Sequence, residues 1–220
     1  MNKEDKELCE EKLRMIKLEL KDGIDAVARF NPSVTFYGSA RLGKGNEVYE
    51  KVHQLSFRIA KELGYNILSG GGPGAMEAAN KGAYDAGVKS VGLTIRLPHE
   101  QGTNPFVTDE IPFNYFFTRQ ASLSYSTEAC IFCPGGFGTI SELFEILTLK
   151  QTKKIDNVPV ILFGSDFWSG LDNYIKENLN DEYQTIDKED TGLYIIEDDI
   201  DKIINIVKES KIRDGSQSLK

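Results

Sequence analysis

The amino-acid sequence predicts an α/β protein: a doubly wound parallel sheet in a single domain, with helices on both faces of the sheet. Short apolar runs of about four to six residues alternate along the chain with amphipathic stretches of about ten residues or more. Glycine-rich turns follow several of these apolar runs, and no long linker, repeat or low-complexity block interrupts the alternation. This pattern is typical of a parallel sheet that is buried on both faces.

The expected elements follow one another along the chain. Apolar residues at three- and four-residue steps over 3–29 predict an N-terminal amphipathic helix that ends at Asn31-Pro32. The expected strands comprise residues 34–38, 65–68, 89–95, 129–133, 158–163 and 193–196. The expected further helices comprise residues 47–63, 74–86, 114–125, 139–151, 167–178 and 200–210. We therefore expect three parts: an N-terminal helix over 1–32, one α/β domain over 33–211, and a polar, disordered tail over 212–220.

The composition argues against several classes of protein. Lys and Arg number 26 against 34 Asp and Glu, and the resulting net charge of −8 would repel nucleic acid. Three cysteines fit a reducing compartment without structural disulfides, and with only two histidines they offer little from which to build a metal site. No apolar run approaches the ~18–20 residues that span a bilayer, and the charged start of the chain is unlike a secretory signal. We expect a cytoplasmic protein that binds no membrane.

Doubly wound sheets bind ligands beyond the carboxyl ends of their strands, so the turns after the strands are candidate sites. The turn after the first expected strand nearly matches the phosphate-loop pattern G-x-x-x-x-G-K-[ST], through Gly38, Gly43 and Lys44. Position 45 is glycine, however, so the hydroxyl that would hold Mg²⁺ is missing. The turn is therefore either a glycine-rich turn with a solvated lysine, or a segment whose backbone amides and Arg41 approach an anion.

The turn after the second expected strand is also rich in glycine. Gly70, Gly72 and Ala75 fit the dinucleotide fingerprint G-x-G-x-x-G/A, but the next expected strand lacks the acid that would bind a ribose, which disfavours NAD. The amides of Gly71 and Gly72 precede a helix, where the helix dipole favours an anion or a ligand hydroxyl. Glu77 is either a ligand-binding carboxylate or one that only complements the helix dipole.

The turn after the expected strand 129–133 forms the strongest anion nest. It contains Gly135, Gly136 and Gly138, whose free amides would point outward, and Thr139 can cap the following helix and donate its hydroxyl to a phosphate. Glu142 follows Thr139 by three residues, which is the spacing of a capping box. Its carboxylate is therefore either used on backbone amides or free for chemistry.

Two further features bear on function. Residues 96–112 form a long expected loop, and loops of this length in a compact domain are more often functional than not. Arg119 then follows an aromatic run. It is either a solvated helix residue or a guanidinium that stacks on a base or holds a phosphate by two parallel hydrogen bonds.

Several residues that resemble redox or base-binding groups are expected to belong to the core instead. Cys130 and Cys133 match C-x-x-C, but an odd separation within one strand sends the two side chains to opposite faces of the sheet. The aromatic run 115–117 is also expected to be core, as are Phe167 and Trp168.

Three segments together resemble the LOG ("Lonely Guy") family of cytokinin riboside 5′-monophosphate phosphoribohydrolases, once named lysine decarboxylases. They are residues 71–80, the segment around Arg119, and residues 134–142, which match the family's PGGxGTxxE motif in full. The likeness covers about 35–164, and residues 97–101 look closest to the bacterial branch. The resemblance implies a Rossmann-like fold, usually dimeric, that hydrolyses the N-glycosidic bond of a nucleoside 5′-monophosphate to a free base and ribose 5-phosphate.

The resemblance also implies roles for single residues. The family's functional arginine and glutamate correspond to Arg119 and Glu142, and a carboxylate near the ribose suits an oxocarbenium-like transition state. The chain departs from the family at Gln120, where a lysine is usual, and at Ser141, where many members have an acid. The substrate phosphate would bind at Gly135, Gly136, Gly138 and Thr139. Other substrate contacts are expected at Gly38, Ser39, Arg41, Gly71, Gly72 and Glu77.

We therefore expect a catalytic nucleotide-binding domain over 33–211 that hydrolyses AMP or an N6-modified AMP, needs no cofactor or metal, and forms a homodimer. The alternative is a non-catalytic nucleotide or molybdenum-cofactor carrier, which Gln120 makes plausible. A lysine decarboxylase is disfavoured because the chain shows no pyridoxal-phosphate lysine motif and the glycine nests suit phosphates better than amino acids. The stretch 8–27 would either extend a dimer surface or cap the sheet.

Overall fold

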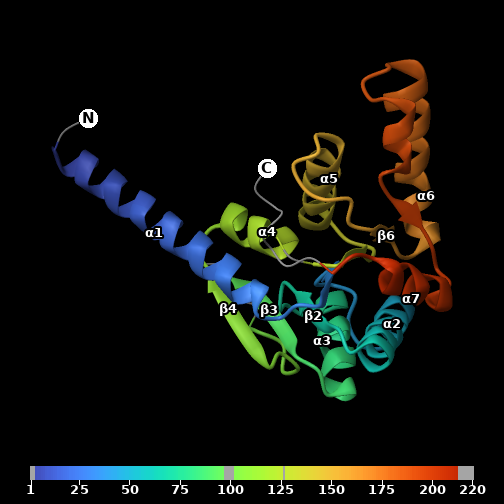
Figure 1. Cartoon of the computed structure of the whole chain (residues 1–220), viewed down its shortest axis with the longest axis horizontal. Helices are drawn as coiled ribbons and strands as arrows, with labels where there is room; N and C mark the ends of the chain where they lie inside the picture. The colour runs from blue at the N-terminus through green and yellow to red at the C-terminus, as the bar shows by residue number, and fades with distance from the viewer. Residues whose placement is uncertain (1–2, 97–101, 126, 213–220) are drawn as a thin grey trace.

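The computed structural model describes residues 3–96, 102–125 and 127–212. The sheet has seven strands, all parallel, in the order β4-β3-β2-β1-β5-β6-β7 (Figure 1). The strands are β1 (Ser33–Tyr37), β2 (Asn66–Ser69), β3 (Ser90–Ile95), β4 (Asp109–Phe113), β5 (Ala129–Phe132), β6 (Val160–Leu162) and β7 (Ile195–Ile196). The predicted parallel sheet is confirmed. The predicted disordered tail lies outside the described residues from position 213 onward.

Helices cover both faces of this sheet, as predicted. They are α1 (Lys3–Ala28), α2 (Glu47–Leu63), α3 (Ala75–Ala86), α4 (Phe116–Tyr125), α5 (Phe137–Gln151), α6 (Ser165–Tyr174) and α7 (Ile200–Glu209). A wider π-type stretch, Ile175–Glu182, continues α6 beyond the helix end expected at residue 178, and a short 3-10 turn spans Lys188–Gly192. Within the described ranges, none of the helices combines the length and the apolar character required to cross a bilayer.

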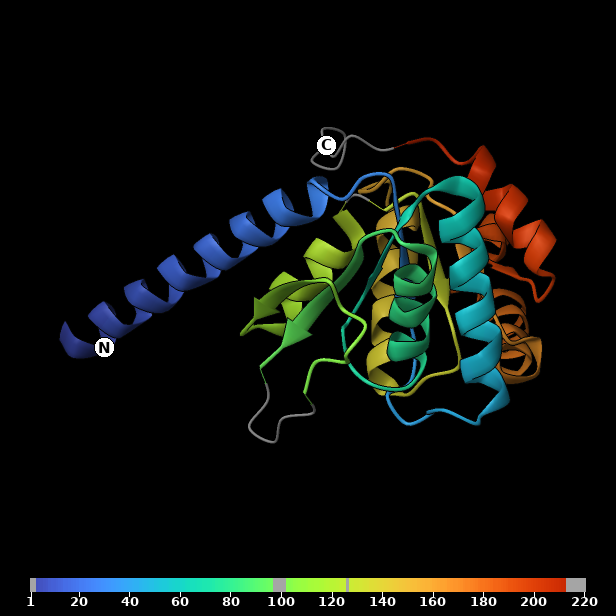
Figure 2. The ribbon, with the colours of Figure 1, turned by 90° about the horizontal axis from the view of Figure 1, so that it is seen from below.

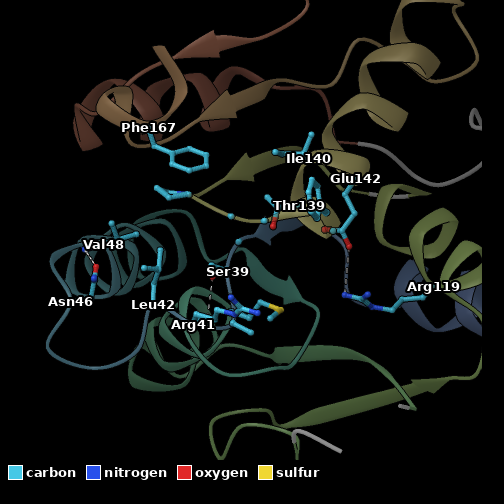
Figure 3. Close-up of a pocket in the computed structure, with 18 residues that line it drawn as sticks. Ser39, Arg41, Leu42, Asn46, Val48, Arg119, Thr139, Ile140, Glu142 and Phe167 are labelled. Atoms are coloured by element: carbon cyan, nitrogen blue, oxygen red, sulfur yellow. Dashed lines mark hydrogen bonds and ion pairs between the residues drawn. The ribbon is translucent and has the colours of Figure 1, made fainter. Parts of the chain in front are cut away.

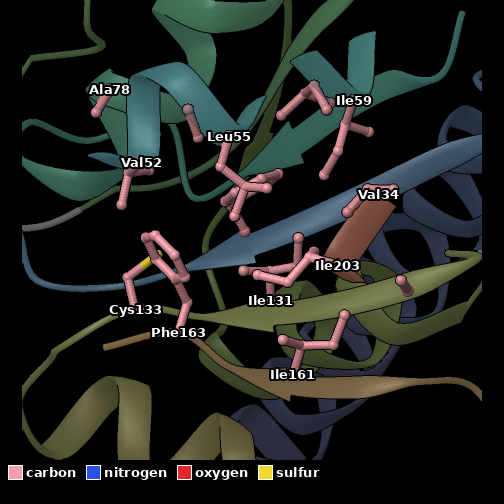
Figure 4. Packing of buried hydrophobic residues seen from close by; sticks show 14 of the residues in the cluster. Val34, Val52, Leu55, Ile59, Ala78, Ile131, Cys133, Ile161, Phe163 and Ile203 are labelled. Carbon is pink, nitrogen blue, oxygen red and sulfur yellow. The ribbon is translucent and has the colours of Figure 1, made fainter. Parts of the chain in front are cut away.

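Two apolar clusters form the core, one on each face of the sheet. On one face the strands pack against α2, α3 and α7, with Leu55 and Ile203 among the fully buried side chains (Figure 4). On the other face they pack against the end of α1 and against α4, α5 and α6, where Trp168 is fully buried. Cys133 belongs to the first cluster and Cys130 to the second. The prediction that these cysteines lie on opposite faces as core residues is therefore confirmed.

Strand β4 was not expected, because the sequence predicts a loop over 96–112. The strand pairs in parallel with β3 and forms one edge of the sheet. Its sequence, DEIPF, carries two acids and a proline, and only Phe113 is fully buried. A proline and charged side chains are tolerated on an edge strand because its outer side needs no hydrogen-bond partner. Because β4 carries these acids and the proline, a prediction based on apolar runs does not detect it.

Three aromatic residues expected in the core are exposed instead. Phe116 and Phe117 in the first turn of α4 are 58% and 55% exposed, and Phe167 in α6 is 45% exposed. Phe117 directly precedes the buried Thr118, and Phe167 directly precedes the buried Trp168. The apolar pattern alone therefore does not decide which aromatic side chain of a short helix turns inward.

Helix α1 leaves the domain over its N-terminal half (Figures 1 and 2). Leu8 and Leu13 are more than half exposed, whereas Ala26 and Val27 at the other end are buried against the domain. Gly23 lies directly against Ser122 of α4 and Phe113 of β4. The C-terminal part of α1 therefore packs on α4 and the edge of the sheet.

The strand order creates one topological switch point. The chain runs from β1 outward to β4, and then returns to place β5 on the other side of β1. The turns after β1 and β5 therefore diverge from a common point, where the amide of Ser39 donates to the carbonyl of Pro134 at 3.0 Å. Ligands bind at such a point in doubly wound sheets.

The close packing of α2 on α3 depends on Gly82. A Cβ at Gly82 would lie 2.6 Å from the backbone nitrogen of Phe57 and 2.7 Å from the carbonyl oxygen of His53. We expect Gly82→Ala to lower the free energy of unfolding by roughly 1–3 kcal/mol through overpacking, as measured by urea denaturation. Gly170 in α6 is the matched control, because, apart from its chain neighbours and the backbone of its own helix, no atom of the described chain lies within 4 Å of its Cβ position. Gly170→Ala should be neutral or stabilising by up to about 1 kcal/mol, and an equal loss in both variants would contradict this explanation.

Candidate functional site

An open cavity of about 900 Å³ lies at the switch point (Figure 3). The turn after β1 and the turn after β5 form its two sides, and α3, α4 and α6 each contribute one side chain. Its lining residues are Gly38, Ser39, Ala40, Arg41, Leu42, Asn46, Val48, Met76, Arg119, Pro134, Gly135, Gly136, Phe137, Gly138, Thr139, Ile140, Glu142 and Phe167. The structure thus brings together residues from five segments that lie far apart in the sequence.

The turn from β5 into α5 presents a helix N-terminus to the cavity. The N-cap position is Gly136, no side chain accepts a hydrogen bond there, and the first helical bond runs from the amide of Ile140 to the carbonyl of Gly136. The amides of the first turn are orphan donors, and the helix dipole adds partial positive charge. Gly135 must lack a Cβ because that atom would overlap the side chain of Thr139. This turn has the features of an anion-binding site.

The expected cap at Thr139 is wrong. The helix begins at Phe137, so Thr139 lies inside its first turn and is buried beside the cavity. The capping-box alternative for Glu142 fails for the same reason, because a capping box requires Thr139 at the N-cap position. The glycine-rich turn is shorter than expected, and the helix begins two residues before the predicted start at residue 139. As a result, the Glu142 carboxylate is not used on the helix end and faces the cavity (Figure 3).

Glu142 is a buried acid beside a single arginine. Its Oε1 lies 3.6 Å from Nη2 of Arg119, and the two side chains are only 14% and 11% exposed. Burial raises the pKa of Glu142 to about 7; the positive charge of Arg119 opposes this rise, and the negative charge of Glu145 adds to it. The carboxyl group therefore changes its protonation state near neutral pH, which is the range in which a proton acceptor works best.

Arg119 comes from α4 and is held from two sides. Its Nε donates to the carbonyl of Leu93 at the end of β3, at 2.8 Å, while Nη2 faces Glu142. The guanidinium passes over Gly70, where a Cβ would overlap Nη2. The sequence pattern places Gly70 in a dinucleotide fingerprint; in the structure its lack of a side chain makes room for the arginine.

The turn after β1 is a packed segment with one cation at the cavity. Gly38 has no room for a side chain, because a Cβ would lie 2.7 Å from Cβ of Ala75 and 3.1 Å from Cβ of Cys133. The hydroxyl of Ser39 accepts a hydrogen bond from the amide of Arg41 at 3.1 Å. Arg41 is exposed, and it lines the cavity opposite the turn after β5 (Figure 3).

Three predicted substrate contacts lie outside the cavity lining. The amide of Asn104 donates to the carbonyls of Gly71 and Gly72, both at 3.0 Å, and so fastens this turn from behind. Oε1 of Glu77 accepts from the hydroxyl of Tyr49 and pairs with Nζ of Lys44, both at 3.1 Å. Glu77 and Lys44 thus form an ion pair, in which the Lys44 side chain is 64% exposed, as the interpretation of a solvated lysine predicts. Residues 97–101, for which the resemblance to the bacterial branch was noted, lie outside the described residues.

Sequence reasoning missed the apolar half of the cavity. Leu42, Val48, Met76, Ile140 and Phe167 line it. Phe137 follows the glycine pair of the turn and is 94% exposed at the cavity. A phenylalanine inside a glycine-rich turn, where no strand or helix face can bury it, is a signal that the sequence does offer. Val48, Met76, Ile140 and Phe167 belong to helices, whose apolar side chains normally enter a core, and Leu42 lies in the turn after β1. Within the described ranges, His, Cys, Asp and Glu do not gather in groups of three or more that could hold a metal ion.

Comparison with known proteins identifies the family of this chain. A family model described as "Possible lysine decarboxylase" matches residues 76–207, which include α3 from its second residue, Arg119 and the whole of the turn from β5 into α5. The chain belongs to this family. Its relatives include proteins named for the LOG activity, so the predicted LOG resemblance is confirmed.

Two curated relatives illustrate the range of named activities. A rice (Oryza sativa) protein named probable cytokinin riboside 5′-monophosphate phosphoribohydrolase LOGL3 is 29% identical over 164 residues, covering 71% of this chain and 74% of the relative. An Escherichia coli pyrimidine/purine nucleotide 5′-monophosphate nucleosidase is 28% identical over 154 residues. That match covers 62% of this chain but only 34% of the relative.

Solved structures share the fold. The molybdenum cofactor carrier protein of Chlamydomonas reinhardtii superposes with a TM-score of 0.61 at 22% identity, over 81% of this chain and 96% of that chain. The molybdenum cofactor binding protein of Rippkaea orientalis gives a TM-score of 0.58 at 21% identity, over 80% and 93% of the two chains. At this identity the likeness concerns the fold alone.

The raised pKa of Glu142 makes the fold less stable at alkaline pH. Below about pH 4.5 the carboxyl is protonated in the folded and the unfolded chain alike; as the pH rises further, the unfolded chain ionises first and the wild type loses stability until about pH 7. We expect the neutral Glu142→Gln variant to exceed the wild type by up to about 3 kcal/mol at pH 8, since one pKa unit corresponds to about 1.4 kcal/mol. Urea denaturation at pH 4 and pH 8 measures this difference. A variant that is less stable at pH 8 would contradict the burial of an ionised Glu142.

Proposed function

We propose that the protein hydrolyses the N-glycosidic bond of a nucleoside 5′-monophosphate and releases the free base and ribose 5-phosphate. The observation that carries this proposal is the buried pair of Glu142 and Arg119, which lies one helical turn beyond an anion-binding helix N-terminus in the same cavity. A phosphate site and a proton-accepting carboxylate at that separation suit the two ends of a ribose 5-phosphate. The names of the relatives support the same class of reaction.

The phosphate would bind at the start of α5. The orphan amides of the turn, with Gly135, Gly136 and Gly138, and the hydroxyl of Thr139 supply neutral donors, and the helix dipole supplies partial positive charge. Arg41 faces the same cavity from the turn after β1 and adds a full positive charge. These contacts would fix the 5′ end of the substrate, so that the sugar extends toward Glu142.

Glu142 would act on the sugar. Cleavage breaks the bond between C1′ and the base nitrogen, and the bonding electrons leave with the base, so that positive charge develops on the ribose. The ionised carboxylate stabilises this charge and takes a proton from the water whose oxygen adds to C1′. The departing base nitrogen takes up a proton and Glu142 gives up the one it received, so that one water molecule is divided between the ribose and the base. Arg119 keeps Glu142 ionised to a lower pH than burial alone would allow.

We propose AMP or an N6-modified AMP as the substrate. The apolar side of the cavity, formed by Leu42, Val48, Ile140 and Phe167, offers surface for a base and for an apolar substituent on it. Phe137 stands exposed at the same cavity, where its ring could stack on a base. The predicted homodimer and cytoplasmic location stay predictions, and the molecular mass in solution would test the first.

A non-catalytic carrier is the second candidate. Gln120 takes the place of the lysine that the LOG family usually has after its arginine, so one positive charge near the presumed substrate is missing. The fold shared with molybdenum cofactor carrier proteins is compatible with this alternative. A carrier would bind a mononucleotide or a related phosphate compound without cleaving it.

Base release from AMP and from N6-isopentenyl-AMP tests the proposed function directly. We expect the purified wild type to release free base, detected by chromatography, and Glu142→Gln to lower kcat at least about 100-fold. Glu145→Gln on the same helix is the matched control, because Glu145 does not line the cavity. At pH 8, where Glu142 is ionised in both proteins, the control should stay within about threefold of the wild type. Tight mononucleotide binding without base release from the wild type would favour the carrier.

The pH dependence of kcat/KM provides an independent test. The ionised form of Glu142 is the active one, so activity should fall as the pH drops through about 7. In Glu145→Gln this midpoint should move to lower pH, since the negative charge of Glu145 raises the pKa of Glu142. The second ionisation of the substrate phosphate affects both proteins equally, so the difference between them reports on Glu142. A midpoint that is the same in both proteins, or one near pH 4.5, would contradict the role of Glu142.

A further inference from the structure

A glutamate from the N-terminal helix caps the helix that carries Arg119. Oε2 of Glu19 accepts from the backbone and side-chain amides of Asn114, both at 2.7 Å, and its Oε1 accepts from the amide of Tyr115 at 3.1 Å and from the hydroxyl of Thr118 at 2.5 Å. Helix α4 begins at Phe116, so these four donors surround its N-terminus. Glu19 therefore accepts from the amide of Tyr115 directly before α4, as the acidic side chain of a capping box accepts from the N-cap amide, and its charge also complements the helix dipole.

Glu19 stays ionised at neutral pH. Partial burial favours its neutral form, but the hydrogen bonds from Thr118, Asn114 and Tyr115 outweigh this effect and lower the pKa of Glu19 below its ordinary value. Hydrogen bonds to an ionised acceptor are stronger than those between neutral groups. The contact between α1 and α4 is therefore made by an ionised carboxylate that accepts several hydrogen bonds at the start of α4.

The packing around Glu19 makes this link close. Four residues further along α1, Gly23 lies so near to α4 that a Cβ would come within 2.5 Å of Oγ of Ser122 and 2.7 Å of the ring of Phe113. Thr118 and Ser122 are one turn apart on α4 and are fully buried. Glu19 and Gly23 thus contact the same face of α4, and together they fix both its start and its orientation.

Arg119 projects from the neighbouring position on the same short helix. The residue before it, Thr118, is held by α1, while Arg119 itself reaches the carbonyl of Leu93 and Glu142 on the other side. Helix α4 has only ten residues, and a small rotation of it would move the guanidinium of Arg119 away from Glu142. The distance between the two groups is already 3.6 Å, so such a movement would weaken the ion pair. The position of Arg119 therefore depends on how α1 holds α4.

We propose that Glu19 is a positioning residue of the site: by capping α4 it holds Arg119 against Glu142, so that α1 is a working part of the enzyme. This inference rests on the proposed function. Helix α1 lies outside the residues that the family model matches, which begin at residue 76. The exposed N-terminal half of α1 is not needed for this role, because Glu19 and Gly23 both lie in the half that contacts the domain.

The test compares Glu19→Ala with Glu10→Ala in base release from AMP, over a range of pH, in the full-length protein. Glu10 is exposed on the same helix, more than two turns before Glu19, which makes it the matched control. The charged groups that act on Glu142 are Arg119 from α4 and Glu145 from α5, and the hydroxyl of Tyr37 from β1 lies close enough to feel its charge. Only Arg119 lies on the helix that Glu19 caps.

We expect Glu19→Ala to lower kcat by about tenfold, because a small displacement of a catalytic group costs one to two orders of magnitude. We also expect the acid limb of its pH profile to move upward by roughly 0.5–1 pH unit, because a more distant Arg119 no longer opposes the protonation of Glu142. Glu10→Ala should match the wild type in both respects. Merely structural damage would reduce the amount of active protein or its melting temperature without moving the pH profile, and that result would overturn the proposal.

Glu19→Gln covers the case in which Glu19→Ala does not fold. The amide retains one acceptor oxygen for the backbone donors but lacks the charge, so the same upward movement of the pH profile is expected with smaller amplitude. An unmoved profile in Glu19→Gln would overturn the proposal. An inactive wild type would instead contradict the proposed function itself, so the two failures are distinguishable.

Discussion

The structure of this site depends on one unfavourable burial: the carboxyl of Glu142 is only 14% exposed, and the guanidinium of Arg119 lies 3.6 Å from it. Burial raises the pKa of this carboxyl and the charge of Arg119 opposes the rise, so that the pKa is about 7. Several other features position the side chain of Arg119 beside Glu142. Gly70 clears the path of Arg119, the carbonyl of Leu93 holds its Nε, and α4 is fastened at its start by Glu19 from α1. The chain thus gives up stability at alkaline pH to keep a reactive carboxylate at the switch point.

The sheet explains why these residues meet at all. Because the chain reverses direction across the sheet after β4, the turns after β1 and β5 separate and leave a cavity between them. The start of α5 faces that cavity with free backbone amides, and Glu142 follows within the next turn of the same helix. An anion site and an acid are therefore built from one short stretch of sequence, while Arg119 must come from another helix and needs support of its own. The ion pair therefore joins Glu142, which is placed by its local sequence, to Arg119, which is placed by packing between distant segments.

The sequence predicts the parts of this arrangement that are local. Periodicity locates α2 at residues 47–63, as observed, and the glycine-rich turn before Glu142 is recognisable from its residues alone. Edge strand β4 was missed because its two acids and its proline are allowed only by its place at the edge of the sheet. The prediction that Thr139 caps α5 was wrong because the helix already begins at Phe137, with Gly136 at the N-cap position and no side chain bonded there. The bond between Glu19 and Tyr115 spans 96 positions, and no local pattern reveals such a contact.

The most direct measurement is the ionisation of Glu142 itself, followed by ¹³C NMR of the glutamate side-chain carboxyls with the Glu142 signal assigned by its loss in Glu142→Gln. We expect this carboxyl to titrate with a midpoint near 7 in the wild type. In Arg119→Gln, where the opposing charge is removed, the midpoint should rise further. A midpoint near 4.5 in the wild type, unchanged in Arg119→Gln, would contradict the claim that burial and Arg119 together set the ionisation of Glu142.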